Sequence, residues 1–394
     1  MTTSHSKCKV FSTRNVLSLL VFCGFTMFMA YQWRSELRVF HIYINGSSLT
    51  FTPPPPAMLS TDQIAKTATI APTRLLASPV FPTGNIHTTT STQPVLTTSR
   101  PVQAVCKNHF REEYLKKQNY LCSRPLGRLG NVMFVYASSY GIATYNNRTL
   151  IMDTGFMLTN YFNLNVQLVD DFECVIKGTK GLGPRQACAF DESLMHIAKG
   201  ENVCLGSYLQ SYKYFEHVQD PIKKQFTFKK DINDKAVDII NGAINTFHKR
   251  NATVKDTRPV LVGVHVRRGD MVKHKFGYAV ATPDYLGNAS KYYRDKYPNT
   301  LFIVCSNGMT WTKKHFVGDD VFYVEGNTFD VDLAVLVNCD HSLTTVGSFS
   351  WWAGFLAGGE VVYYQWPAVE KSGLRRHFSA DYTDFFPPRW IGMK

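Results

Sequence analysis

The chain of 394 residues lacks two features that would indicate a metal-binding or a nucleic-acid-binding protein. None of its nine cysteines forms a CxxC pair, the usual spacing of structural zinc ligands. It has no basic tract with interleaved aromatic residues, so the formal net charge of +13 does not indicate a nucleic-acid partner. Residues 1–105 carry +6 of that charge, which leaves a mild +7 for residues 106–394.

The cysteines are widely spaced, which favours disulfides in an oxidising compartment over a metal site. Seven of them lie beyond residue 100, so at least one thiol is predicted to be free. Cys305, within the apolar run LFIVC, is the expected buried thiol. The seven are Cys106, Cys122, Cys174, Cys188, Cys204, Cys305 and Cys339.

A long apolar run occupies residues 16–33, behind a basic tail at residues 1–15. Its length just suffices to cross a bilayer as a helix, and basic residues favour the cytoplasmic side. A cleaved signal peptide is the alternative, but its apolar region would be shorter and followed by small residues. The run predicts an uncleaved transmembrane signal-anchor with the carboxyl side in the lumen of the early secretory pathway.

Residues 34–105 are rich in Thr, Ser and Pro, which predicts a disordered, O-glycosylated stem. An anchor, a stem and a lumenal domain are typical of Golgi glycosyltransferases, and also of many cell-surface receptors. The remaining 289 residues suffice for two lobes, predicted at 106–250 and 251–394. Four N-x-S/T sequons agree with a lumenal domain, at Asn45, Asn147, Asn251 and Asn288.

The most informative segment is VLVGVHVRRGD at 260–270, where an apolar run ends abruptly in charged residues. The run predicts a buried strand of a parallel sheet, and ligands bind beyond the carboxyl ends of such strands. Arginine is the usual partner of phosphate, since its planar fork donates two parallel hydrogen bonds. The segment therefore indicates a nucleotide-diphosphate site. A surface Arg–Asp pair that closes a turn is the alternative.

Strands and helices are predicted to alternate through the carboxyl-terminal half, which favours a parallel α/β sheet. Gly347-Ser348-Phe349-Ser350 lies at a strand-to-helix junction, where backbone N–H groups could hold a phosphate, or a serine could simply cap the helix. The expected strands are 301–305, 321–324, 342–346 and 361–366, and the expected helices 328–339 and 351–357.

The amino-terminal half shows two further patterns. Glycines 127 and 130 around Arg128 predict a turn at a helix start, with Arg128 near the cleft. The segment LGSYLQSYKYF at 205–215 carries aromatic residues that could stack on sugar rings or form an ordinary half-buried surface, and the sequence leaves both interpretations open.

Five motifs in this order resemble the galactoside α-1,2-fucosyltransferase family: GRLGN (127–131), HVRRGD (265–270), SNGMTW (306–311), NCDHSLTTVGSFSWWAGFLAGG (338–359) and RWIG (389–392). The resemblance covers essentially all of 120–394. It implies two Rossmann-like lobes of the GT-B type, with GDP-fucose held by the carboxyl-terminal lobe. The implied reaction transfers fucose, with inversion and without a metal or other cofactor, to the 2-hydroxyl of a terminal β-galactose in the Golgi.

The resemblance also implies residue roles. Arg267 would hold the diphosphate and stabilise the departing GDP, with Asp270 the nearby candidate for a catalytic group. Asp332 would read guanine. The general base, the aglycone and homodimer formation stay open. The other donor-side residues implied are Arg128, Asn131, His265, Ser348, Phe349 and Ser350.

Three alternatives are retained. Asp330-Val331-Asp332 is a DxD motif, which holds manganese in another glycosyltransferase fold, but here it is predicted to start a helix rather than to end a strand. A protein O-fucosyltransferase shares the HxRR pattern and would act on a folded protein. A lumenal glycan-binding receptor would use the aromatic surface and would have no need of GDP.

Overall fold

The computed structural model describes residues 40–44, 47–51, 119–251 and 257–394. The chain forms two units, 1–97 and 98–394. The predicted tail and membrane anchor lie outside the described residues, among which no helix is long and apolar enough to cross a membrane. In the first unit, the antiparallel strands β1 (Phe40–Ile44) and β2 (Ser47–Phe51) fall within the predicted stem. The stem prediction missed this hairpin, although Asn45-Gly46 between the strands is a hairpin-favouring dipeptide.

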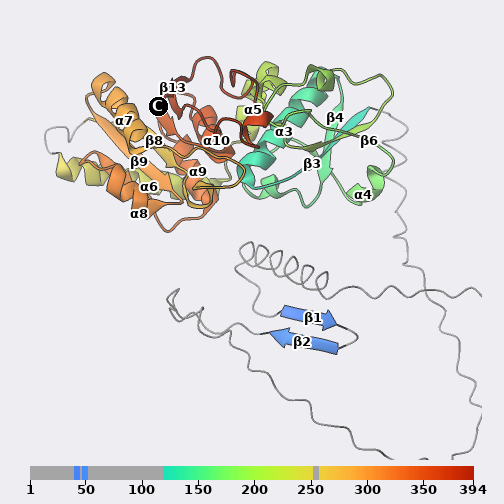
Figure 1. Ribbon diagram of the computed structural model, residues 1–394, viewed down its shortest axis with the longest axis horizontal. Coiled ribbons are helices and arrows are strands. Elements are labelled where there is room, and N and C mark those ends of the chain that lie inside the picture. Colours follow the sequence, from blue (N-terminus) through green and yellow to red (C-terminus); the bar gives the residue numbers. More distant parts are fainter. Residues whose placement is uncertain (1–39, 45–46, 52–118, 252–256) are drawn as a thin grey trace, which may run out of the picture. The chain divides into compact units, whose positions relative to one another are not determined.

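The second unit contains two parallel sheets, which confirm the predicted α/β class (Figure 1). The amino-terminal sheet has the order β5-β4-β3-β7-β6. The order reverses between β3 and β7, which are neighbours. Its strands are β3 (Tyr120–Pro125), β4 (Thr149–Asp153), β5 (Gln167–Val169), β6 (Lys180–Leu182) and β7 (Val203–Ser207).

The carboxyl-terminal sheet has the order β10-β9-β8-β11-β12-β13, and all its pairings are parallel. The expected strands are confirmed, and the edge strand β13 adds one that the sequence pattern did not predict. Its strands are β8 (Val260–Val266), β9 (Thr300–Ser306), β10 (Val321–Tyr323), β11 (His341–Thr344), β12 (Val361–Tyr364) and β13 (Ile391–Met393).

Helices cover both faces of the carboxyl-terminal sheet. On one face, Tyr285 and Tyr293 of α7 donate hydroxyl hydrogen bonds to the carbonyl oxygens of Thr344 and Ser342. On the other face lie α9 and α10, and α6 packs against α9. The longer helices are α3 (Leu129–Tyr145), α6 (Lys230–Arg250), α7 (Pro283–Lys296), α9 (Phe329–Val337) and α10 (Ser348–Ala357).

Short helices fill the connections. They are α4 (Phe172–Val175), α5 (Gln219–Gln225), α8 (Met309–His315), η2 (Met157–Asn160), η3 (Glu192–Met195), η4 (Tyr212–Tyr214), η5 (Glu216–Val218), η7 (Gly269–Met271) and η8 (Arg375–His377). Tyr212, Tyr214 and Phe215 are buried in the core, which excludes sugar stacking for these three and differs from the half-buried surface that was the alternative. Tyr208 of the same segment is exposed.

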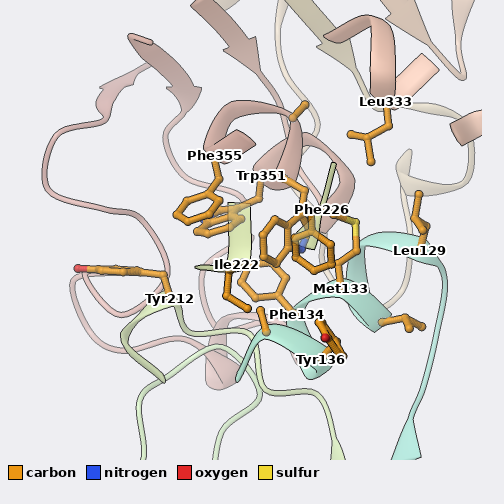
Figure 2. Packing of buried hydrophobic residues seen from close by; sticks show 14 of the residues in the cluster. Leu129, Met133, Phe134, Tyr136, Tyr212, Ile222, Phe226, Leu333, Trp351 and Phe355 are labelled. Atoms are coloured by element: carbon orange, nitrogen blue, oxygen red, sulfur yellow. The ribbon is translucent and has the colours of Figure 1, made fainter. Parts of the chain in front are cut away.

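One hydrophobic core runs through both lobes and joins them (Figure 2). Phe134 of α3 lies 4.5 Å from Trp351 of α10 between ring centroids, and Phe215 stacks on Trp352 at 5.7 Å. All four rings are essentially inaccessible to solvent. Because separating them would expose several large aromatic surfaces to water, the two lobes are fixed at this junction.

The cysteines depart from expectation. Cys174 is disulfide-bonded, and the buried free thiol predicted at Cys305 is confirmed. The expectation of disulfides is wrong for four further cysteines, which are also buried and free; apolar strands and helices accommodate them as small hydrophobic side chains. They are Cys122, Cys188, Cys204 and Cys339.

Candidate functional site

The candidate site begins where the strand order of the carboxyl-terminal sheet reverses, between β8 and β11. Ligands of open parallel sheets bind at such a reversal, beyond the carboxyl ends of the strands. Here the two strand ends are tied together by Thr345. Its hydroxyl accepts a hydrogen bond from the backbone N–H of Arg267 at 2.8 Å and donates one to the carbonyl oxygen of His265 at 3.0 Å.

Arg267 carries the main charge at this point. Its guanidinium side chain is 18% exposed, and its Nη2 lies 2.7 Å from a carboxylate oxygen of Asp270. Arg128 of the other lobe approaches the same carboxylate, with Nη1 3.3 Å from Oδ2. Burial lowers the pKa of Arg267, but an arginine keeps its proton at any physiological pH. Two guanidinium groups thus share one carboxylate, which leaves a net positive charge.

Asp270 is held from several sides. Besides the two arginines, Asn307 donates from Nδ2 to its Oδ1 at 3.3 Å. These contacts hold the Asp270 carboxylate against both guanidinium groups. Its prediction as a group that itself touches the reacting atoms stays a prediction.

Arg268 has a different role from its neighbour. Its guanidinium carbon lies 3.6 Å from the centroid of the Trp311 ring, and its Nη1 donates to the carbonyl oxygen of Ala281 at 3.0 Å. Its backbone N–H donates to Asn307. The side chain is therefore engaged within the carboxyl-terminal lobe, and only one arginine of the RRGD motif is available at the strand end.

The amino end of α10 supplies further donors. The helix starts after Gly347, whose φ of 108° is rarely adopted by other residues and whose position borders the Arg267 side chain. First-turn backbone N–H groups of a helix have no partner within the helix, and the helix dipole adds positive potential there. This end of α10 therefore favours an anion beside Arg267.

The serines of this turn differ in accessibility. Ser350 is fully buried, and its Oγ lies 2.6 Å from Nδ1 of His265, so its hydroxyl is engaged inside the fold. Burial, together with Arg267, lowers the pKa of His265 to about 3, which keeps the imidazole neutral. The His265 ring also packs 4.8 Å from that of Phe349. His265 thus contacts both Phe349 and Ser350 of α10.

The amino end of α3 meets that of α10. A Cβ atom at Gly130 would lie 2.6 Å from the backbone nitrogen of Phe349, and Nε1 of Trp352 donates to the Gly130 carbonyl oxygen at 3.0 Å. Ser348 donates its hydroxyl hydrogen to Oδ1 of Asn131, which also accepts from Gln210 at 2.9 Å. The predicted helix start is confirmed, with Gly127 at a φ of 98°.

Asp332 lies in the first turn of α9, the helix that follows β10 in the chain. Its Oδ1 atom is buried and has no hydrogen-bond partner among the described residues. Burial, reinforced by the nearby Asp330, raises the pKa of Asp332 to about 6. A buried acceptor without a donor is costly, so this carboxylate is suited to a ligand that brings N–H groups.

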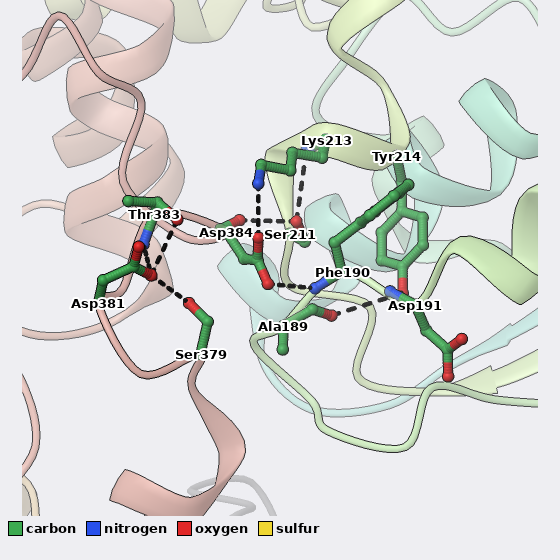
Figure 3. Close-up of polar contacts among 10 residues, drawn as sticks. All are labelled: Ala189, Phe190, Asp191, Ser211, Lys213, Tyr214, Ser379, Asp381, Thr383 and Asp384. Atoms are coloured by element: carbon green, nitrogen blue, oxygen red, sulfur yellow. Dashed lines mark hydrogen bonds and ion pairs between the residues drawn. The ribbon is translucent and has the colours of Figure 1, made fainter.

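A second junction between the lobes was not predicted, because no motif marks it (Figure 3). Asp384 accepts from Nζ of Lys213 at 2.7 Å and from the backbone N–H of Phe190 at 2.9 Å. Ser211 donates to the Asp384 carbonyl oxygen at 2.6 Å. The segment after β12 therefore crosses back to the amino-terminal lobe and fixes it from a second side.

The remaining predicted positions are the four N-x-S/T sequons. Asn147 is exposed in the turn after α3, and Asn288 on α7 donates to the Lys394 carbonyl oxygen at 3.2 Å. Asn251 follows α6, and Asn45 lies outside the described residues. Within the part of the chain that the structure describes, no three His, Cys, Asp or Glu side chains gather as metal ligands.

Comparison with known proteins identifies the family. The model of glycosyl transferase family 11 matches residues 89–394. Galactoside α-(1,2)-fucosyltransferase 2 of Bos taurus is 31% identical over 279 residues, 68% of this chain and 77% of the relative. The Sus scrofa enzyme of the same name is 31% identical over 285 residues, 68% and 78% of the two chains. Fucosyltransferase NodZ from Bradyrhizobium is 13% identical in the superposed structures, with a TM-score of 0.40 over 60% of this chain and 92% of NodZ. The chain belongs to glycosyl transferase family 11.

Proposed function

We propose that this protein is a galactoside α-1,2-fucosyltransferase, which transfers L-fucose from GDP-fucose to the 2-hydroxyl of a terminal β-galactose. Family membership and the names of the two mammalian relatives support the reaction class. The observation that carries the proposal is the meeting of two helix N-termini, α3 and α10, beside the half-buried Arg267. In the proposed GT-B-like arrangement, this point receives the donor diphosphate.

The charge balance suits a departing nucleoside diphosphate. As the bond between fucose and phosphate breaks, negative charge grows on the β-phosphate, and preorganised donors stabilise it without reorganisation. Arg267 supplies a fixed cation, Arg128 supplies a second one from the other lobe, and the first turn of α10 supplies N–H donors. In this mechanism arginine provides the charge that a metal provides in other glycosyltransferases.

The reaction balances as an inverting displacement. The galactose 2-oxygen forms a bond to the anomeric carbon of fucose, GDP leaves with the electron pair of the broken bond, and the hydroxyl proton passes to a base. Asp270 is the candidate for this base that the sequence motif suggested. Its contacts with Arg267 and Arg128, however, favour a positioning role.

Asp332 is the proposed reader of guanine. Its unpaired, buried Oδ1 would accept hydrogen bonds from the guanine N1–H and N2–H groups, for which adenine and uracil have no equivalent arrangement. Ionisation of this carboxylate would be favoured by those two donors, which offsets the burial that raises its pKa to about 6.

The proposal includes the cellular setting. The apolar run 16–33 would anchor the protein in the Golgi membrane as a single-pass type II protein, with stem 34–105 and a lumenal catalytic unit. Sequons at exposed Asn147 and Asn288 agree with lumenal exposure. Protease protection and glycosidase sensitivity in sealed microsomes would test this orientation.

The deciding experiment incubates the purified full-length protein with GDP-fucose and two acceptors, methyl β-D-galactoside and a folded protein domain with an exposed Ser or Thr. We expect fucose on the galactoside only, in α linkage to its 2-hydroxyl as determined by NMR. Fucosylation of the folded domain alone would assign a protein O-fucosyltransferase. Binding of galactosides without any transfer would assign a receptor.

A further inference from the structure

A relay of hydrogen bonds ends at the point where α3 and α10 meet. Oδ1 of Asn131, the third residue of α3, accepts from Nε2 of Gln210 at 2.9 Å and from the hydroxyl of Ser348, the first residue of α10. Gln210 follows β7, so three separate segments of the chain converge on one amide oxygen. These two donors fix which way the Asn131 amide faces, because an amide nitrogen could accept neither of them.

The nitrogen of the same amide has no such engagement. Among the described residues, Nδ2 of Asn131 donates no hydrogen bond, and it is not enclosed in the core. It lies beside Gly127, where a Cβ atom would come within 2.6 Å of Nδ2, so the amide has room only because residue 127 is a glycine. A fixed amide thus presents its two N–H donors at the meeting point of the two helix N-termini.

The backbone on both sides of Gln210 is held in place. The carbonyl oxygen of Leu209 accepts from the buried hydroxyl of Ser138 on α3 at 2.7 Å, and Ser211 donates to the carbonyl oxygen of Asp384 at 2.6 Å. The Gln210 side chain therefore starts from a backbone that is attached to both lobes. Its position is set by the fold and not by its bond to Asn131 alone.

Cys188 decides how the amide of Gln210 is turned. Its Sγ donates to Oε1 of Gln210 at 3.5 Å, and the backbone N–H of Gln210 donates to the carbonyl oxygen of the preceding Ala187 at 2.8 Å. Burial raises the pKa of Cys188 far above its ordinary value, so the thiol keeps its proton and remains a donor. Because this thiol faces the oxygen of the Gln210 amide, the nitrogen of that amide faces Asn131.

We propose that Gln210 is a positioning residue for fucose transfer: oriented by Cys188, it holds the Asn131 amide so that Nδ2 faces the β-phosphate of the donor. This inference rests on the proposed GDP-fucose site. Every bond of the relay runs in the same direction, from thiol to Gln210 to Asn131 to phosphate, and aligned hydrogen bonds polarise one another. The charge that grows on the departing GDP would meet a donor that needs no reorientation.

The test compares the binding of GDP with that of GMP, which lacks the β-phosphate, to the full-length protein at pH 7.5. Gln210→Glu keeps the size of the side chain but replaces the donor Nε2 by a carboxylate oxygen that repels Oδ1 of Asn131. The loss should resemble that of a hydrogen bond to a charged group, so we expect GDP affinity to fall at least about 10-fold and GMP affinity to stay within about twofold. The kcat with GDP-fucose should fall as well.

Gln186→Glu is the matched control. Gln186 lies in the same lobe, and its Nε2 also donates across to the other lobe, to the carbonyl oxygen of Arg376 at 2.7 Å, but it has no bond to Asn131. This variant should retain the wild-type ratio of GDP to GMP affinity. For the thiol, Cys188→Ala should lower that ratio, and Cys188→Ser, which restores a donor, should recover it.

A double variant distinguishes positioning from a general structural role. Asn131→Ala has no amide to orient, so adding Gln210→Glu to it should change GDP affinity by less than about twofold. Thermal unfolding checks that each variant folds. If Gln210→Glu does not fold, Gln210→Met, which is of similar size and uncharged, takes its place with the same expected results.

The outcomes separate this inference from the function on which it rests. If the Gln210 variant weakens GDP and GMP equally, or if it acts as strongly in the Asn131→Ala background, the positioning role is overturned while the donor site stands. An unchanged ratio in Cys188→Ala would overturn the part assigned to the thiol. If the wild type binds GDP no better than GMP, the proposed diphosphate site fails, and the relay fails with it.

Discussion

Gly130 and Phe349 are the second residues of helices on different lobes, yet they are in direct contact: a Cβ atom at residue 130 would lie 2.6 Å from the backbone nitrogen of Phe349. Real Cβ atoms do not approach a nitrogen so closely, so this contact requires glycine. It brings the amino ends of α3 and α10 together beside Arg267, and the core of aromatic rings beneath it keeps them there.

We expect Gly130→Ala to lower both stability and donor affinity, because the added methyl group meets backbone atoms that cannot move aside. Overpacking of this kind costs about 1–3 kcal/mol. Gly242→Ala is the matched control, since nothing lies within 4 Å of its Cβ position on α6; it should stabilise the protein by about 0.5–1 kcal/mol. Denaturant unfolding and GDP-fucose binding measure both effects, and an equal response of the two variants would contradict the contact.

Arg267→Ala should reduce fucose transfer by about 100- to 1,000-fold or more while the protein remains folded, since it removes the cation that we propose faces the leaving diphosphate. Arg267→Lys should recover only part of the rate, because an ammonium group lacks the planar fork. Single-turnover rates at saturating donor report the chemical step. A loss confined to KM, with unchanged kcat, would show that Arg267 contributes to ground-state binding alone.

Asp332→Asn should weaken GDP binding about 10- to 100-fold, because one acceptor oxygen becomes a donor that faces the guanine N–H groups; each unsatisfied buried group costs roughly 1–3 kcal/mol. ADP and UDP should bind poorly to the wild type, and the substitution should lower their affinity less than it lowers that of GDP. Competitive inhibition at pH 7.5 measures all three nucleotides. A variant that keeps the wild-type preference for GDP would place guanine recognition elsewhere.

Donor affinity should fall as the pH drops below about 6, the value to which burial and Asp330 raise the pKa of Asp332. The sign follows from the proton: below pH 6 the carboxyl is protonated in the free protein and must ionise before it accepts both guanine donors, so affinity falls up to about tenfold per pH unit. GDP-fucose is the ligand to titrate, because a terminal phosphate itself ionises near pH 6. Asp332→Asn should show no such slope, and identical slopes would exclude Asp332 as the titrating group.

Transfer should persist in excess EDTA, since in the proposed mechanism Arg267 and the α10 N-terminus supply the charge that the diphosphate needs. Activity lost in EDTA and restored by Mn²⁺ would instead make Asp330 and Asp332 metal ligands. Calcium or magnesium added to untreated enzyme should leave kcat unchanged.

The sequence alone determined the local elements and the chemistry at their ends. Apolar runs such as 260–266 are strands because both faces are covered, and the charged residues that follow must then lie at a sheet edge. The start of α3 at GRLGN and the burial of Cys305 follow from equally local patterns. The prediction of disulfides was wrong for the other free cysteines, because the spacing of cysteines along the chain does not show which thiols face each other in the fold.

Only the tertiary structure decided how those ends combine. The two arginines of RRGD are identical in the sequence, yet Arg268 stacks on Trp311 while Arg267 faces Asp270 and Arg128, a partner 139 residues away. In the sequence, Ser348 and Ser350 are equivalent candidates for donating to a phosphate. In the structure, Ser348 donates to Asn131, while Ser350 is buried against His265. Such choices depend on which surfaces the folded lobes bring together. Long-range packing sets them, and no periodicity within a single segment encodes them.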